Sequence, residues 1–137
     1  NTPEVGGLES INDLSKLIKM SAINFYVLEG NKIIGFVICF RENSEYKSPN
    51  YNYFKNKEDK FLYIDRVVIK ESYRRRGAGS YLYDRLDELA KKEGIPLCCE
   101  VNIMPRNEIS LSFHYKKGFK DDGECHFEHH SVRYLKK

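Results

Sequence analysis

The first forty residues alternate between a helical and a strand-like hydrophobic pattern. Residues 10–20 place four apolar side chains on one helical face, and Ser10 can cap the helix that this spacing predicts. Residues 25–28 and 32–40 are rich in β-forming side chains and flank a short turn with a glycine at its centre. This pattern predicts a helix followed by a β-hairpin.

In the middle of the chain, strand-like and helical hydrophobic patterns again follow one another. Residues 61–69 are apolar at nearly every position, which is typical of a central strand covered on both faces. A helix opens at residues 74–80 and ends at Gly94, since glycine and the proline two residues later stop helices. Residues 97–101 form the next predicted strand.

The last third completes the pattern. Residues 109–117 predict a helix that Asn107 can cap and Gly118 can end. Residues 119–127 and 131–135 predict a closing pair of strands. The order of elements indicates an α/β (α+β) fold with a mixed sheet covered by helices.

Residues 41–60 show neither the helical nor the strand-like hydrophobic repeat. The segment is polar but carries Tyr46, Tyr51, Tyr53 and Phe54. We expect an irregular segment that is either a lid over a binding site or a partly disordered loop. Stacking of these rings on single-stranded nucleic acid is an alternative.

Composition narrows the class of protein. The chain has 137 residues, of which 41% are hydrophobic and 31% charged, so we expect one folded domain over residues 1–137. No apolar run is long enough to span a membrane and no signal peptide is visible, which favours a cytoplasmic protein. The net charge of +3 permits an anionic ligand but makes nucleic acid an improbable partner.

The residue types that could bind a metal are poorly spaced for it. No C-x-x-C pair is present, and buried free thiols are the favoured interpretation of the cysteines in apolar runs, Cys39, Cys98 and Cys99. His126, His129 and His130 cluster without helical or turn spacing, so we expect exposed histidines and no metal.

The chemistry centres on Arg74-x-x-Gly77-x-Gly79, between a strand and a helix. Glycine lets backbone approach a ligand closely, and the helix directs unpaired N–H groups at the loop. A pyrophosphate suits such a site, and Arg74, Arg75 and Arg76 add positive charge. A glycine turn beside a solvated basic run remains open on these residues alone.

Two motifs in order resemble the GNAT superfamily of N-acetyltransferases. VVIKESYRRRGAGSYLYDRL is similar to its acetyl-CoA loop, and NEISLSFHYKKGF is similar to its downstream helix. The resemblance implies a mostly antiparallel central sheet with helices on both faces and a splay between the fourth and fifth strands. The superfamily's first strand is not evident in this sequence.

The resemblance also implies a cofactor site. The pantetheine arm of acetyl-CoA would pair with the strand at Val67, Val68 and Ile69, and Asn107 would bond to that arm. The pyrophosphate would lie on the loop and helix start, at Arg74, Arg75, Arg76, Gly77, Ala78, Gly79 and Ser80.

The implied reaction is direct transfer of an acetyl group from acetyl-CoA, without a metal, to a primary amine. The amine would belong to a small molecule or a protein N-terminus. The side chains of Tyr46, Tyr51 and Tyr53 would line the pocket that binds it. The protein would be a monomer or a homodimer. A catalytically silent CoA-binding module is the alternative, with a basic nucleic-acid-binding domain as a third.

The strand positions that the resemblance implies also suggest candidate acid and base residues. Asp65 and Glu100 lie on the two strands expected to flank the acetyl group, where either could take a proton from the amine. Asp65 could instead pair with Arg66, and Glu100 could face solvent.

The superfamily commonly has a tyrosine seven residues after the asparagine, where it protonates the departing thiolate. Here that position is His114, and Tyr115 follows it. The two point about 100° apart on a helix, so only one can face the sulfur. We predict that His114 is the general acid.

Overall fold

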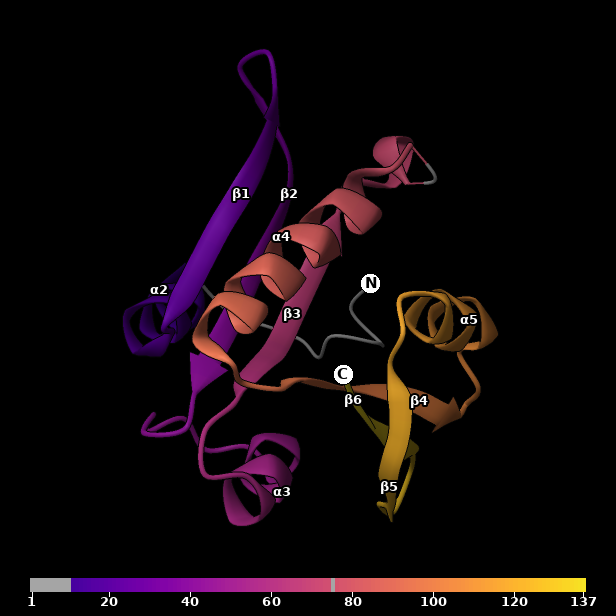
Figure 1. Cartoon of the computed structure of the whole chain (residues 1–137). Helices are drawn as coiled ribbons and strands as arrows, with labels where there is room; N and C mark the ends of the chain where they lie inside the picture. The colour runs from indigo at the N-terminus through magenta and orange to yellow at the C-terminus, as the bar shows by residue number, and fades with distance from the viewer. Residues whose placement is uncertain (1–10, 75) are drawn as a thin grey trace.

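The computed structural model describes residues 11–74 and 76–137. Within them, six strands form one sheet in the order β1-β2-β3-β4-β6-β5. Every neighbouring pair is antiparallel except β3 and β4 (Figure 1). The strands are β1 Ile23–Glu29, β2 Lys32–Arg41, β3 Leu62–Ile69, β4 Leu97–Met104, β5 Lys120–His126 and β6 Ser131–Lys136. The mixed, mostly antiparallel sheet predicted from the sequence is confirmed.

Helices join these strands. They are α2 Ile11–Met20, α3 Pro49–Lys57, the 3₁₀ turn η1 Glu71–Tyr73, α4 Ala78–Glu93 and α5 Glu108–Lys116. Gly94 ends α4 with a φ of 67°, a left-handed angle that favours glycine. Asn107 caps α5 by accepting a hydrogen bond from the backbone N–H of Ser110. Both sequence-predicted helix ends are therefore confirmed, whereas the predicted cap at Ser10 lies outside the described residues.

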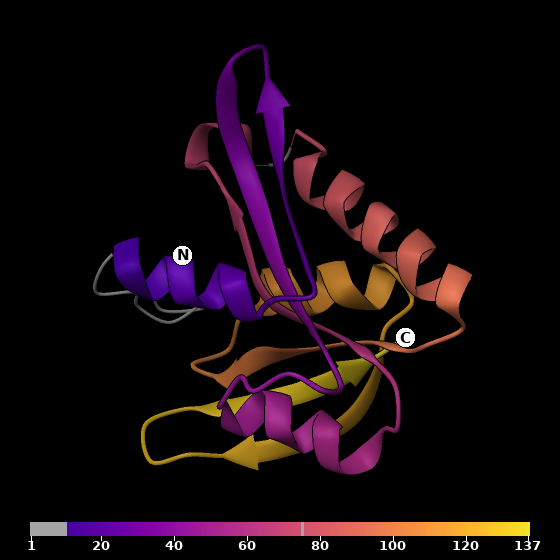
Figure 2. The ribbon, with the colours of Figure 1, turned by 90° about the vertical axis from the view of Figure 1, so that its left-hand side faces the viewer.

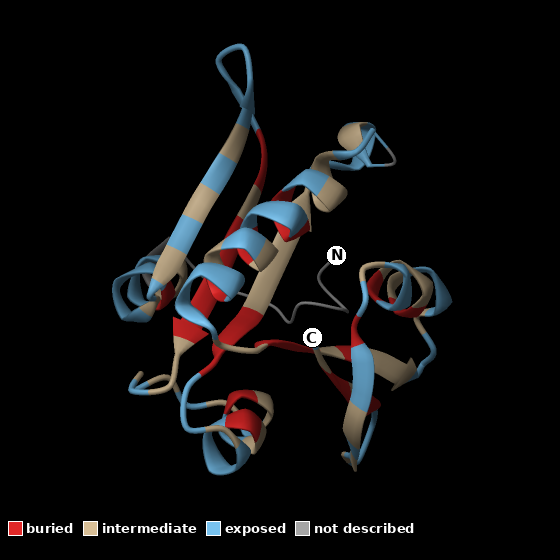
Figure 3. Ribbon diagram, viewed as in Figure 1, coloured by how far each residue is buried: buried red, intermediate tan, exposed pale blue. Residues whose placement is uncertain are grey.

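The sheet is covered on both faces. One core cluster joins α4 and α5 to one face, through buried residues such as Leu82, Leu86 and Leu111. The other joins α2 and α3 to the opposite face through Leu17 and Phe54. Figure 2 shows α4 and α2 on opposite sides of β1–β3, and Figure 3 shows that the buried side of α4 faces the strands.

The segment predicted to be irregular is the main correction to the fold. Its second half is helix α3, which Ser48 caps by accepting a hydrogen bond from the N–H of Tyr51, with Pro49 in the first turn. Tyr51 and Phe54 are fully buried. Because α3 is short and buries aromatic rather than aliphatic side chains, its sequence lacks the usual helical hydrophobic pattern.

β3 and β4 separate soon after they meet. They pair only at Leu62 with Leu97 and at Tyr63 with Cys98, although each strand has eight residues. Beyond Tyr63, β3 continues beside β2 while β4 turns away toward α5 (Figure 1). This separation of two neighbouring strands has the form of the splay that the family resemblance implies.

The cysteines and histidines match their predicted environments. The four cysteines are free, and Cys39, Cys98 and Cys99 are buried. His126, His129 and His130 are exposed. Among the described residues, no group of histidine, cysteine or carboxylate side chains is arranged to hold a metal, and no helix is long and apolar enough to cross a membrane.

Candidate active site

Past Tyr63, β4 no longer pairs with β3, so the outer half of β3 lies along the split between the two strands. Val67, Val68 and Ile69 lie in this half, pair with β2 on the other side, and are partly buried. The backbone of an extended strand at such a split is a suitable place for an extended ligand to bind, as an added strand would. These are the three residues that the family resemblance assigns to the pantetheine arm.

The glycine loop lies past the end of β3, at the N-terminus of α4. Gly77 has a φ of 85°, and a Cβ built on it would meet no atom within 4 Å, so its backbone angle, rather than crowding, requires glycine. α4 has no side-chain cap at this end, so its first amide groups point outward. Such an end favours an anion.

Cationic side chains flank this helix end. The guanidinium of Arg76 stacks on the ring of Tyr73 at 4.8 Å and lies 3.7 Å from the carboxylate of Glu29. Arg74 follows directly after η1, and Arg75 lies outside the described residues. Lys117, which the sequence interpretation did not include, donates a hydrogen bond to the hydroxyl of Ser80.

Two carboxyl groups face the α3 side of the sheet near the split. Glu100 accepts a hydrogen bond of 2.5 Å from the hydroxyl of Tyr63 on β3. Burial raises the pKa of Glu100 to about 8, with a smaller contribution from the charge of Asp65, while the Tyr63 hydrogen bond opposes the shift. A carboxyl group with this pKa can accept a proton near neutral pH.

Asp65 accepts hydrogen bonds from two side chains. The hydroxyl of Tyr46 donates to it at 2.9 Å, and the side chain of Arg66 donates at 3.1 Å. Burial raises the pKa of Asp65, while Tyr46 and Arg66 act in the opposite direction. The alternative expected from the sequence, an ion pair between Asp65 and Arg66, is thus formed.

His114 lies in the interior on the α4 side of the sheet, with 5% of its surface exposed. Its Nδ1 is 2.6 Å from the backbone carbonyl of Ser110, so Nδ1 carries the proton that this bond requires. Its Nε2 then accepts a bond of 2.7 Å from the hydroxyl of Tyr83 on α4. Burial lowers the pKa of His114, which keeps the ring neutral.

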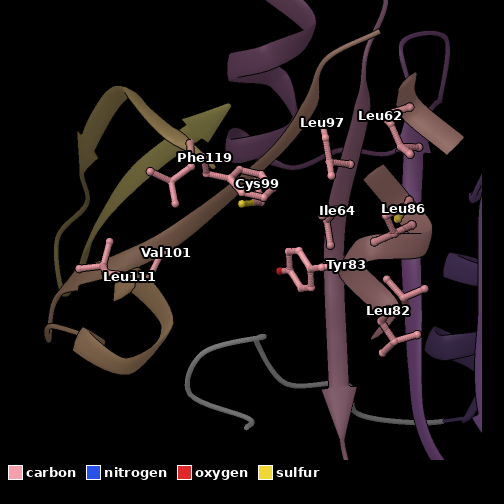
Figure 4. Packing of buried hydrophobic residues seen from close by; sticks show 14 residues of the cluster. Leu62, Ile64, Leu82, Tyr83, Leu86, Leu97, Cys99, Val101, Leu111 and Phe119 are labelled. Atoms are coloured by element: carbon pink, nitrogen blue, oxygen red, sulfur yellow. The ribbon is translucent and has the colours of Figure 1, made fainter. Parts of the chain in front are cut away.

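Tyr83, which bonds to His114, projects from α4 toward β4. Figure 4 shows its ring projecting past Ile64 toward the side where β4 carries Cys99 and Val101. Tyr115, the neighbour of His114, points elsewhere: its hydroxyl donates to Asp121 at 2.6 Å and accepts from Arg133. The structure therefore places His114, and not Tyr115, on the side of the split.

The three tyrosines assigned to the amine pocket have different environments. Tyr51 is fully buried and its hydroxyl donates to the backbone carbonyl of Arg41, so no surface remains for a ligand to contact. Tyr53 stacks on Tyr134 at 3.8 Å and donates to Asp122. Only Tyr46, through Asp65, contacts the carboxyl groups at the split.

Sequence reasoning missed Tyr63, Tyr83 and Lys117. Tyr63 precedes Asp65 by two residues, so the two share a face of β3, a signal that could have been used. Tyr83 and Lys117 acquire their positions from the packing of α4 against α5, which no local pattern encodes.

A sheet that opens between two neighbouring strands, with a helix N-terminus beside the opening and buried carboxyl groups at it, could hold an extended anionic ligand. The model of the acetyltransferase (GNAT) family matches residues 7–119. The chain belongs to this family. A comparison with curated protein sequences found no match.

Solved structures share the fold at low identity. NAA60 of Arabidopsis thaliana, in complex with a bisubstrate analogue, is 14% identical with a TM-score of 0.74, over 97% of this chain and 84% of that chain. The ribosomal-protein-S18-alanine N-acetyltransferase of Escherichia coli is 13% identical with a TM-score of 0.64, over 95% and 90%.

A protein of Bacillus anthracis str. Ames, provisionally assigned as a streptothricin acetyltransferase and solved with acetyl coenzyme A, is 21% identical with a TM-score of 0.64. The match covers 85% of this chain but only 62% of the length of that protein.

Proposed function

We propose that the protein transfers an acetyl group from acetyl-CoA directly to a primary amine. The observation that carries the proposal is the split between β3 and β4, which has the glycine loop of α4 beyond its open end and Glu100 at its edge. Membership of the GNAT family supports the same reaction.

The cofactor would extend along the split. Its pantetheine arm would pair with β3 at Val67–Ile69, as an added strand would, and Asn107 would bond to it from the start of α5. The pyrophosphate would lie on the N–H groups of the first turn of α4. This arrangement places the thioester near the point where β3 and β4 meet, since the arm runs from the loop toward Tyr63.

Glu100 would act as the general base. Its carboxylate takes a proton from the substrate ammonium, and the neutral nitrogen forms a bond to the thioester carbonyl carbon. A backbone N–H on the open edge of β3 would stabilise the oxyanion. Asp65 and Tyr46 would orient the amine beside Glu100.

Collapse of the intermediate breaks the C–S bond, and its electron pair goes to sulfur. The sulfur takes a proton from the hydroxyl of Tyr83, which His114 positions. The second proton of the attacking nitrogen, passed through water, restores Tyr83. In this proposal His114 acts through Tyr83 because both nitrogens of its ring are already hydrogen-bonded.

The acceptor is an amine of a small molecule or a protein N-terminus. A likeness to the E. coli enzyme, which is named for an alanine of ribosomal protein S18, is compatible with an N-terminus. Free buried thiols fit a reducing compartment such as the cytoplasm.

The proposal is tested by incubating the protein with acetyl-CoA and a panel of amino acids, polyamines, aminoglycosides and peptides with free N-termini. Released CoA thiol is measured, and mass spectrometry then locates one added acetyl group on the amine. Binding of acetyl-CoA without acetylation of any amine would support the silent module instead.

A further inference from the structure

Lys117 stands at the first turn of α4 although it belongs to the end of α5. We infer that its ammonium group is a ligand for the pyrophosphate of acetyl-CoA. The inference rests on the proposed function and adds a residue to the cofactor site that neither the sequence motif nor the family match identifies.

The geometry brings two α5 side chains to this turn. Lys117 caps the C-terminus of α5, and its Nζ donates a hydrogen bond to the hydroxyl of Ser80, the third residue of α4. Phe113, one turn earlier on α5, lies below the ammonium at 6.0 Å, and its ring tip is 4.0 Å from where a Cβ of Gly79 would stand. The ammonium is therefore fixed beside the amide groups that would hold a phosphate.

The electrostatic surroundings stabilise the Lys117 ammonium group only in part. The C-terminus of α5 favours a cation, but the N-terminus of α4 disfavours one, because the exposed amide groups there carry partial positive charge. The remaining counter-charge is Asp84, 2.8 Å from Nζ, whose side chain is 62% exposed. Exposed ion pairs of this kind contribute little, typically 0 to about 1 kcal/mol.

A bound pyrophosphate would neutralise the positive charge of the Lys117 ammonium and of the α4 amide groups. It would accept hydrogen bonds from the first-turn amides and from the ammonium together, in the way that charge-assisted bonds hold phosphates. The Lys117 side chain is 20% exposed, so it is accessible at one side yet held in place by Phe113 and Ser80. The competing explanation is that Lys117 only ties α5 to α4.

The test compares Lys117→Met with Lys116→Met, its exposed neighbour, by calorimetric titration with acetyl-CoA and with acetyl-3′-dephospho-CoA. We expect Lys117→Met to weaken binding of both cofactors about tenfold, the loss of one charge-assisted bond, and to reduce the salt dependence of Kd. Lys116→Met should leave both Kd values unchanged.

Asp84→Asn should change the affinity for acetyl-CoA in the opposite direction. Removing a carboxylate from the phosphate site should tighten acetyl-CoA binding by about two- to fivefold, an exposed-charge effect. A purely structural tie predicts instead that Lys117→Met and Asp84→Asn both lower thermal stability without altering the salt dependence of Kd, which would overturn the inference.

The other possible results of the titrations distinguish a failure of the Lys117 inference from a failure of the proposed function. If Lys117→Met loses affinity for acetyl-CoA but not for the 3′-dephospho cofactor, the ammonium meets the 3′-phosphate and the pyrophosphate assignment is wrong. If the wild-type protein binds neither cofactor, the proposed function itself fails. If wild type binds and Lys117→Met binds equally well, only the inference about Lys117 fails.

Discussion

At the scale of single residues, Glu100 has the most consequential environment in the molecule. It is a buried carboxyl group that accepts a hydrogen bond from Tyr63, and burial raises its pKa to about 8. Asp65, its neighbour across the split, has both Tyr46 and Arg66 as partners. The sequence could name both carboxylates but could not rank them, because the partners come from other elements.

The raised pKa of Glu100 predicts the pH dependence of catalysis. A base with this pKa is mostly protonated below pH 7, so kcat/KM should rise with pH and level off above an apparent pKa of about 8. Glu100→Gln should lower kcat about 100- to 1,000-fold, within the usual range for general base catalysis. Asp65→Asn should have a smaller effect, and the opposite ranking of the two variants would assign the base to Asp65.

The same shift predicts an effect on stability. Because the pKa in the folded state lies above the ordinary value of 4.5, the contribution of Glu100 to stability is fully present below pH 4.5 and is lost as pH rises through 8. Glu100→Gln should therefore unfold at a higher temperature than wild type at pH 9 and show little advantage at pH 5. Parallel thermal unfolding of the two proteins at both pH values measures this difference.

Tyr83 and His114 give a further test at this scale. Tyr83→Phe removes the hydroxyl proposed to protonate the sulfur and should lower kcat about tenfold or more with little change in acetyl-CoA affinity. His114→Phe should lower kcat similarly, while Tyr115→Phe, which breaks only surface contacts with Asp121 and Arg133, should be mild. A larger effect from Tyr115→Phe than from Tyr83→Phe would place the acid on the other side of α5.

At the scale of elements, most helices and strands were predictable because their local signals agree with their packing. Gly94, Asn107 and Gly118 mark helix ends by backbone preferences that act locally. α3 was not predictable, since its tyrosines could be assigned to a ligand or to the core with equal logic. Packing against Phe61, Tyr63 and Tyr134 decides that question.

The burial of α3 changes the expected effect of substitutions there. Tyr51→Ala should cost about 3 to 5 kcal/mol of unfolding free energy, as for other buried aromatic side chains. The milder Tyr51→Phe removes two hydrogen bonds, the one donated to the Arg41 carbonyl and the one accepted from the Ser44 N–H, and should cost about 1 to 3 kcal/mol. Chemical denaturation measures both, and neither the Phe variant nor a folded Ala variant should change the KM for the amine. A selective rise in that KM would restore Tyr51 to the amine pocket.

At the scale of the whole molecule, the site exists because two halves of one sheet diverge. One half carries β1, β2 and β3 with α4, and the other carries β4, β6 and β5 with α5 (Figure 1). Among the described residues, strand pairing joins the two halves only at two residue pairs of β3 and β4, and packing of α4 against α5 adds further contacts. The sequence implied this split only by family resemblance, because no local pattern specifies where two strands stop pairing.

The central claim is that acetyl-CoA binds in this split with its pyrophosphate on the α4 loop. Gly77 has a left-handed backbone angle that valine disfavours, so Gly77→Val should distort the loop while leaving the distant core packed. Glu100→Gln leaves the loop intact and serves as the matched control.

Isothermal titration of acetyl-CoA into the three proteins tests this claim most directly, with thermal unfolding to verify that each is folded. We predict one binding site per chain in wild type and Glu100→Gln, and no measurable binding in folded Gly77→Val. Equal binding by Gly77→Val and wild type, or no binding by wild type, would contradict the account.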